Sequence, residues 1–138
     1  DTTRAVLNMI ANGVIERYPN VTLIVPHNGS FLPNVYDRFQ RILNNLVERG
    51  LREPIDFQAN FEKLYFDTSG NPNPNTEFLL TYASPEKIMY GSDFPFTAKN
   101  VVISKLKETK EYYAENERIA PYTDLIFTEN CKRLFKLP

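Results

Sequence analysis

Short unbroken apolar runs alternate along the chain with longer stretches in which apolar residues recur every three or four positions. The runs at residues 21–25, 64–67 and 87–90 are rich in β-branched and aromatic residues, and we expect each to form a buried strand. The first run stops at Pro26, which has no backbone donor for a sheet. The pattern therefore predicts three strands, of which the first is apolar on both faces and suits a buried parallel sheet.

The stretches between these runs carry apolar stripes at helical spacing and predict five helices. The predicted helices begin near Asp1, after Pro33, at Pro72, at Val101 and at Thr123. We expect the first to end at Tyr18-Pro19-Asn20 and the last to be interrupted near Thr128. Residues 51–62 show no clean period, so we expect a long loop there with room for one turn of helix.

The resulting order, α-β-α-β-α-β-α-α, indicates a parallel sheet with right-handed crossovers. A chain of 138 residues is long enough for one domain with a real core. No repeat, low-complexity segment or flexible linker divides it. We therefore predict a single α/β domain.

Composition excludes several classes of protein. Lys and Arg number 16 against 17 Asp and Glu, without a basic stripe for nucleic acid. No apolar run approaches the ~18 residues that cross a bilayer, so we expect no membrane partner. The single cysteine, Cys131, excludes an internal disulfide and fits a reducing compartment, and we expect a cytoplasmic location. We interpret it as a small buried side chain rather than a nucleophile.

Chemically active residues lie at the ends of the three predicted strands. His27, Asp67 and Asp93 come at or just after their carboxyl ends, where parallel α/β folds bind ligands. Each also has a structural interpretation: His27 can hydrogen-bond its loop, and Asp93 can cap the helix or loop that comes after it. For Asp67 we favour an Asx-turn, because Thr68, Ser69 and Gly70 after it are turn formers.

Four segments together resemble the amidohydrolase-2 family, which includes aminocarboxymuconate-semialdehyde decarboxylase and γ-resorcylate decarboxylase. They are GVIERYPNVTLIVPHNGSFLP, LYFDTS, MYGSDFP and NCKRLFKL, and they extend over essentially the whole chain. The resemblance implies the second half of a TIM-type (β/α)₈ barrel, with about three parallel strands and five helices. Residues 1–138 would be the C-terminal part of a single barrel domain, incomplete on its own.

The resemblance also implies site residues. Asp93 matches the family's metal-binding aspartate, and His27 matches the histidine that acts as acid or base beside a metal-bound water. Arg38 matches an arginine that reaches a neighbouring subunit's substrate carboxylate, although an exposed helix charge explains it equally well. The family's second glycine after the histidine is Ser30 here.

The implied cofactor is a divalent metal, with zinc expected and manganese compatible. The family's His-x-His pair and fifth-strand histidine are not in this sequence, so most ligands would lie outside the chain. The implied partners are a small-molecule substrate, the missing N-terminal half of the barrel and further copies in a homo-oligomer. Because the chain starts at Asp1 rather than Met, we expect a truncated form.

We therefore expect part of a metal-dependent decarboxylase or hydrolase for a small carboxylate-bearing or aromatic substrate, inactive as this chain alone. The residues do not decide between decarboxylation and hydrolysis. One alternative is a non-catalytic α/β module that keeps the scaffold without a complete metal site. Another is a small independent three-stranded binding domain, which would have to cover both faces of its sheet itself.

Overall fold

A three-stranded parallel sheet forms the centre of the computed structural model, which describes residues 1–70 and 72–138. The strands are β1 (Ile24–Val25), β2 (Tyr65–Asp67) and β3 (Ile88–Met89), in the order β1-β2-β3. β2 pairs with both neighbours, and Phe66 lies opposite Val25 on one side and Ile88 on the other. The predicted parallel sheet is confirmed, with strands shorter than the apolar runs that signalled them.

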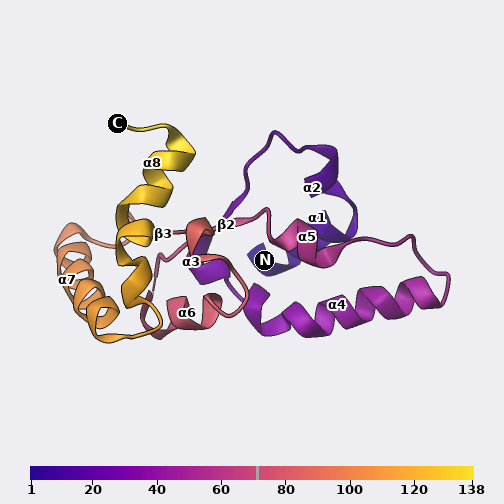
Figure 1. Ribbon diagram of the computed structural model, residues 1–138, viewed down its shortest axis with the longest axis horizontal. Coiled ribbons are helices and arrows are strands. Elements are labelled where there is room, and N and C mark those ends of the chain that lie inside the picture. The colour runs from indigo at the N-terminus through magenta and orange to yellow at the C-terminus, as the bar shows by residue number, and fades with distance from the viewer. Residues whose placement is uncertain (71) are drawn as a thin grey trace.

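Eight α-helices surround the sheet in the described part of the chain, against about five expected. They are α1 (Thr2–Ala11), α2 (Val14–Arg17), α3 (Pro26–Gly29), α4 (Leu32–Glu48), α5 (Phe57–Phe61), α6 (Pro72–Leu79), α7 (Lys99–Glu115) and α8 (Asn130–Phe135). Figure 1 shows α1, α2, α4 and α5 gathered on one side of the strands and α7 and α8 on the other. None of these described helices is long and apolar enough to cross a membrane.

The extra helices have local causes. Gly13 adopts φ 66°, in the left-handed region, and so divides the expected first helix into α1 and α2. In the stretch expected to be a loop, the Asp56 carboxylate accepts from the Ala59 amide at 2.9 Å and caps α5. The expected interruption of the last helix is confirmed, because a π-helical segment, η3 (Leu125–Glu129), precedes α8.

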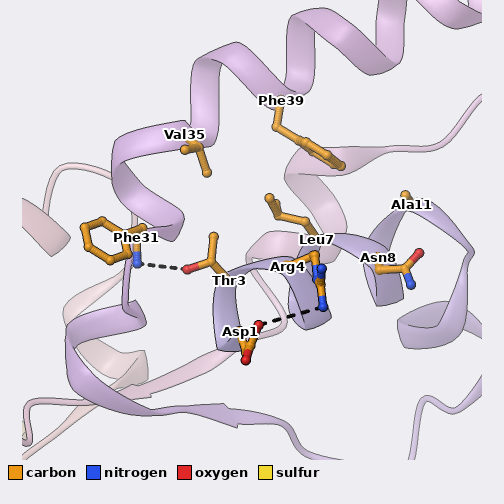
Figure 2. Close-up of a pocket in the computed structure, with 9 residues that line it drawn as sticks. All are labelled: Asp1, Thr3, Arg4, Leu7, Asn8, Ala11, Phe31, Val35 and Phe39. Atoms are coloured by element: carbon orange, nitrogen blue, oxygen red, sulfur yellow. Dashed lines mark hydrogen bonds and ion pairs between the residues drawn. The ribbon is translucent and has the colours of Figure 1, made fainter.

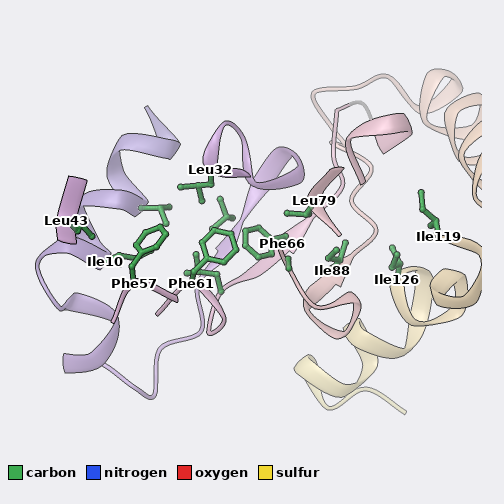
Figure 3. Packing of buried hydrophobic residues seen from close by; sticks show 14 of the residues in the cluster. Ile10, Leu32, Leu43, Phe57, Phe61, Phe66, Leu79, Ile88, Ile119 and Ile126 are labelled. Carbon is green, nitrogen blue, oxygen red and sulfur yellow. The ribbon is translucent and has the colours of Figure 1, made fainter. Parts of the chain in front are cut away.

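The core is a row of fully buried side chains that follows the sheet from end to end (Figure 3). Phe66 of β2 lies near its middle, with its ring centroid 5.5 Å from that of Phe61 on α5. Ile88 of β3 and Ile126 of η3 continue the row and have no exposed surface. Each such side chain contributes roughly 1.5–3 kcal/mol by leaving water. The short strands are therefore held mainly by packing.

Asn130 fastens the last helix to the third strand. Its side chain is fully buried, and its Nδ2 donates to the carbonyl oxygens of Pro85 and Ile88 at 2.7 Å each. Its Oδ1 accepts from the Arg133 guanidinium at 2.9 Å. Both amide hydrogens of Asn130 are thus donated to the segment that leads into β3, so α8 is held against this strand. The next residue, Cys131, was expected to be buried but is only half-buried.

Asn130→Ala is expected to lower the free energy of unfolding by about 1–3 kcal/mol, because two buried carbonyl groups lose their donor. Urea denaturation followed by circular dichroism measures the change. The matched control is Asn44→Ala at an exposed position of α4, expected to stay within about 0.5 kcal/mol. Equal stability of the two variants would contradict the structural role of Asn130.

Candidate active site

The carboxyl ends of all three strands meet at one edge of the sheet, because the strands are parallel and adjacent. His27 follows β1 after Pro26, Asp67 is the last residue of β2, and Asp93 lies four residues beyond the end of β3. The topology thus brings His27 and Asp93 to the same edge, on either side of Asp67.

A strained turn carries His27. Three non-glycine positions have left-handed φ values, with His27 at 59°, Asn28 at 53° and, after Gly29, Ser30 at 54°. Each such residue costs roughly 1–2 kcal/mol. Gly29 is required by space as well as by backbone angle, because a Cβ there would lie 3.1 Å from the Phe66 ring. The turn leaves His27 exposed while the two residues after it are buried.

A buried hydrogen-bond chain supports this turn from below. The Thr76 hydroxyl on α6 donates to the Asn28 side-chain oxygen at 3.0 Å, and the Tyr113 hydroxyl on α7 donates to Thr76 at 2.7 Å. All three side chains are buried. Burial raises the pKa of Tyr113 to about 12, against the smaller opposite effects of its hydrogen bonds to Thr76 and Thr68. These buried hydrogen bonds offset part of the backbone strain of the turn.

Asp67 links the ends of β1 and β2. Its Oδ1 accepts from the Ser69 amide at 2.9 Å, which is the expected Asx-turn, and from the Ser69 hydroxyl at 2.6 Å. The same oxygen accepts from the backbone amide of His27 at 3.0 Å. The Ser69 hydroxyl also lies 3.1 Å from Nδ1 of the His27 ring. Asp67 and Ser69 are therefore a structural turn that also holds the histidine.

Ser69 is the site residue that sequence reasoning missed. Its only signal was a place among turn-forming residues, and its contact with His27 spans 42 positions. The backbone of two glycines packs closely against Asp67 and His27. A Cβ at Gly91 would lie 3.1 Å from Cγ of Asp67, and one at Gly70 would lie 3.3 Å from Nδ1 of His27.

Asp93 is held by its own loop. It has φ 60° and is half-buried, and its Oδ2 accepts from the Thr97 hydroxyl at 3.2 Å. Its carbonyl oxygen accepts from the Thr97 amide at 2.8 Å. Across residues 1–70 and 72–138, no three His, Cys, Asp or Glu side chains gather as metal ligands would. A single carboxylate can supply one ligand for a hard or borderline divalent cation, so the chain fits as a contributor to a metal centre.

His27 also lines a cavity of about 500 Å³. The other lining residues come from the turn, the start of α4 and α6: Asn28, Ser30, Phe31, Pro33, Asn34, Asn75 and Phe78. Asp93 and Arg38 are not among them, and Arg38 is exposed on α4. The cavity thus joins polar amide and hydroxyl groups to aromatic side chains beside the histidine.

A larger cavity of about 630 Å³ lies between α1 and α4 and shares Phe31 with the cavity beside His27 (Figure 2). Leu7, Val35 and Phe39 make much of its wall apolar, and the Phe31 amide donates to Thr3 at its margin at 3.0 Å. It contains neither His27 nor Asp93. We base the candidate site on the strand ends because His27 there can move a proton and Asp93 can hold an ion.

The sequence profile of the family described as "Amidohydrolase" matches residues 1–137. The chain belongs to the amidohydrolase family. Among curated relatives, it is 31% identical over 122 residues to decarboxylase macB of Penicillium terrestre, covering 83% of the chain and 35% of the relative. It is also 31% identical over 108 residues to 6-methylsalicylic acid decarboxylase of Penicillium expansum, covering 75% and 32%.

Solved structures give the same result for the fold. A protein described as amidohydrolase II superposes with a TM-score of 0.80 and 29% identity, over 99% of this chain and 42% of that one. The 5-carboxyvanillate decarboxylase of Novosphingobium aromaticivorans, complexed with manganese and 4-hydroxy-3-methoxy-5-nitrobenzoic acid, has a TM-score of 0.77 at 19% identity, over 98% and 38%. The expected fold, part of an amidohydrolase (β/α)₈ barrel, is confirmed, and this amidohydrolase chain spans about a third of the length of these curated relatives.

Tyr113→Phe removes the hydroxyl at the end of the buried chain beneath the His27 turn. We expect it to lower the free energy of unfolding by about 1–2 kcal/mol, because Thr76 loses a buried partner. The neighbouring Tyr112→Phe is the matched control. The half-buried Tyr112 hydroxyl donates a 3.4 Å bond to Glu77 and accepts a 3.3 Å bond from Asn116, both longer than the Tyr113 bond, so we expect a smaller loss. Urea denaturation at neutral pH measures both, and an equal loss would contradict the structural role of Tyr113.

The same pair tests the effect of burial on ionisation. The folded pKa of Tyr113 lies above its unfolded value near 10, so the unfolded state releases this proton first as the pH rises. The stabilisation is complete below pH ~10 and is lost as the pH rises towards about 12. We expect stability to fall less steeply over this window in Tyr113→Phe than in Tyr112→Phe.

Proposed function

We propose that this chain is the C-terminal part of a metal-dependent amidohydrolase-type decarboxylase for a small aromatic carboxylate. The observation that carries the proposal is that His27 and Asp93 both follow the carboxyl ends of strands of one parallel sheet, in a chain that matches the family over residues 1–137. Support for decarboxylation over hydrolysis comes from the two curated relatives, both named decarboxylases. This edge is where barrel enzymes place their chemistry.

In the proposed reaction, His27 moves the proton. A protonated His27 ring donates to the substrate carbon that carries the carboxylate; that carbon's bond to the carboxylate then breaks, and CO₂ leaves. The new C–H bond uses an electron pair of the substrate's π system, the electron pair of the broken C–C bond restores that system, and His27 is left neutral. Nδ1 already contacts Ser69, so Nε2 is the nitrogen we assign to the transfer.

Asp93 is proposed as the metal ligand that this chain supplies. A divalent cation held there would supply Lewis-acid chemistry, which stabilises negative charge on a substrate oxygen. Manganese is the first ion to test, because one structural neighbour is complexed with it, and zinc is the second. The remaining ligands would come from the part of the barrel that these 138 residues do not supply.

Arg38 is proposed to bind the substrate carboxylate of a neighbouring copy. Its exposure on α4 leaves the guanidinium available at a surface, and a guanidinium can bind a carboxylate through two hydrogen bonds. This role requires a homo-oligomer in which α4 approaches the next subunit's site.

A second candidate, a non-catalytic module on the same scaffold, is favoured by one observation. Within the described residues no cluster of three metal-ligating side chains exists. Metal content separates the two: a complete barrel that contains this chain should hold about one divalent ion per site if it is an enzyme, and none if it is such a module. Elemental analysis of the complete gene product gives the answer.

In the complete barrel, His27→Gln is expected to lower kcat by about 10²–10⁴-fold, because general acid–base catalysis contributes this much. Bound metal should be unchanged. Asp93→Asn is expected to lower bound metal as well as activity, because the charged ligand is lost. CO₂ release from a panel of hydroxybenzoates and elemental analysis measure the two effects.

The exposed carboxylate Asp37 on α4 supplies the matched control for Asp93→Asn, and Asp37→Asn should change neither quantity. If His27→Gln kept full activity while the complete barrel decarboxylated a substrate, His27 would not be the proton donor.

We also expect the 138-residue chain by itself to be inactive and to self-associate. A (β/α)₈ barrel needs at least ~200 residues. The described part exposes large apolar side chains in the loops after β1 and β3, with Phe31 at 71%, Phe94 at 63% and Phe96 at 93% exposure. Light scattering coupled to gel filtration measures association. A monodisperse, active monomer would overturn this part of the proposal.

A further inference from the structure

Ser69 makes two contacts that together restrict where the hydrogens can be. Its hydroxyl oxygen lies 2.6 Å from Oδ1 of Asp67 and 3.1 Å from Nδ1 of His27. A serine hydroxyl has one hydrogen to donate, and an ionised carboxylate only accepts. If that hydrogen pointed at His27, two oxygens 2.6 Å apart would face each other without a hydrogen between them. The hydrogen therefore lies on the Asp67 contact.

The position of the serine hydrogen decides the state of the histidine ring. With its hydrogen donated to Asp67, Ser69 can only accept from His27, so Nδ1 must carry a hydrogen. A neutral imidazole has one N–H, and Nε2 is then the unprotonated nitrogen. The backbone contributes as well, because the His27 amide donates to Asp67 at 3.0 Å and approaches the Ser69 oxygen at 3.4 Å.

We infer that Asp67, Ser69 and His27 form a hydrogen-bonded relay in which Ser69 is a positioning residue that holds neutral His27 in its Nδ1–H tautomer. The relay orients the ring through Ser69 and leaves Nε2 to take up or deliver a proton. A protonated ring keeps the same contact, because Nδ1 carries a hydrogen in that state as well. The role is that of an orienting partner behind an acid–base histidine, with a hydroxyl placed between carboxylate and ring.

The surroundings keep the relay in this geometry. Ser69 is 6% exposed and the preceding Thr68 is fully buried. The backbone of Gly91 and Gly70 lies so close to Asp67 and to Nδ1 that a side chain at either position would displace them. Thr68 accepts from the Gly91 amide at 3.3 Å, which ties the end of β3 to the same turn. The ring thus has one defined partner at Nδ1 and a partly exposed remainder.

The first test reads the tautomer directly and needs no activity. Long-range ¹H–¹⁵N correlation spectra of the ¹⁵N-labelled complete protein distinguish the two ring nitrogens, and His27→Gln identifies the signals. We expect Nδ1 to be protonated in neutral His27, and we expect Ser69→Ala to raise the Nε2–H population because Nδ1 loses its acceptor. An Nε2–H tautomer in the unmodified protein, or an unchanged tautomer in Ser69→Ala, would overturn the inference.

The second test rests on the proposed function and measures decarboxylation. Ser69→Ala should lower kcat by about 10–100-fold, the usual effect of losing such an orienting partner, with KM changed by less than about threefold. Ser69→Thr, which keeps the hydroxyl, should recover part of kcat. Ser104→Ala is the matched control, because this exposed hydroxyl on α7 donates to Glu108 on the same helix at 2.9 Å, and the variant should leave kcat unchanged.

The outcomes separate the two ideas. An unchanged kcat in Ser69→Ala, in an otherwise active enzyme, would overturn the relay. If the unmodified protein decarboxylated nothing but showed the Nδ1–H tautomer with its dependence on Ser69, the proposed function would fail and the relay would stand. Circular dichroism of each variant confirms that a lost signal does not come from unfolding.

Discussion

The hydrogen bond from the His27 backbone amide to Asp67 Oδ1, 3.0 Å long, is the contact on which the site depends. It joins the end of β1 to the end of β2 at the place where the ladder between them stops. Pro26 has no amide to continue that ladder, and the chain turns at once into left-handed geometry. The acceptor on the neighbouring strand therefore fixes the point at which this turn leaves the sheet.

The strain in the turn is balanced by groups that are far away in sequence. Asn28 receives a hydrogen bond from α6, and Tyr113 of α7 lies behind it with no exposed surface. Such residues act on the site without facing it. A histidine on a turn that is packed from below has a fixed backbone and an accessible ring, which is the combination that acid–base chemistry requires.

Ser30 illustrates how a non-glycine residue is held in a backbone geometry that favours glycine. The position where relatives are expected to carry a second glycine adopts φ 54° and ψ −123° here, with its amide donating to the His27 carbonyl at 2.9 Å. A non-glycine residue can be held in such a region when its surroundings determine the backbone. Ser30 also lines the cavity beside His27, so the substitution adds a hydroxyl to the wall.

The sequence by itself determined the parallel sheet, its strand order of appearance and the edge at which His27 and Asp93 lie. Apolar runs and helical stripes are local signals that indicate the strands and helices. Because parallel strands end on one side of a sheet, the residues that follow them are expected at the same edge. It also indicated the Asx-turn at Asp67, because that bond spans only two residues. The sequence pattern did not indicate that the first helix is divided at Gly13, because the apolar spacing continues across this glycine. It also did not indicate the helix capped by Asp56, because a five-residue helix is too short to show a clear period.

Only the tertiary structure decided what surrounds the histidine. Ser69 meets His27 across 42 positions, and Tyr113 meets Thr76 across 37. Sequence periodicity does not predict such pairs, because it reflects contacts between residues that are near one another in the chain. These pairs form only when separate strand–helix units pack against each other. The carboxylate, the hydroxyl and the ring become one hydrogen-bonded group only when β1 and β2 lie side by side, since the strand pairing sets their separation.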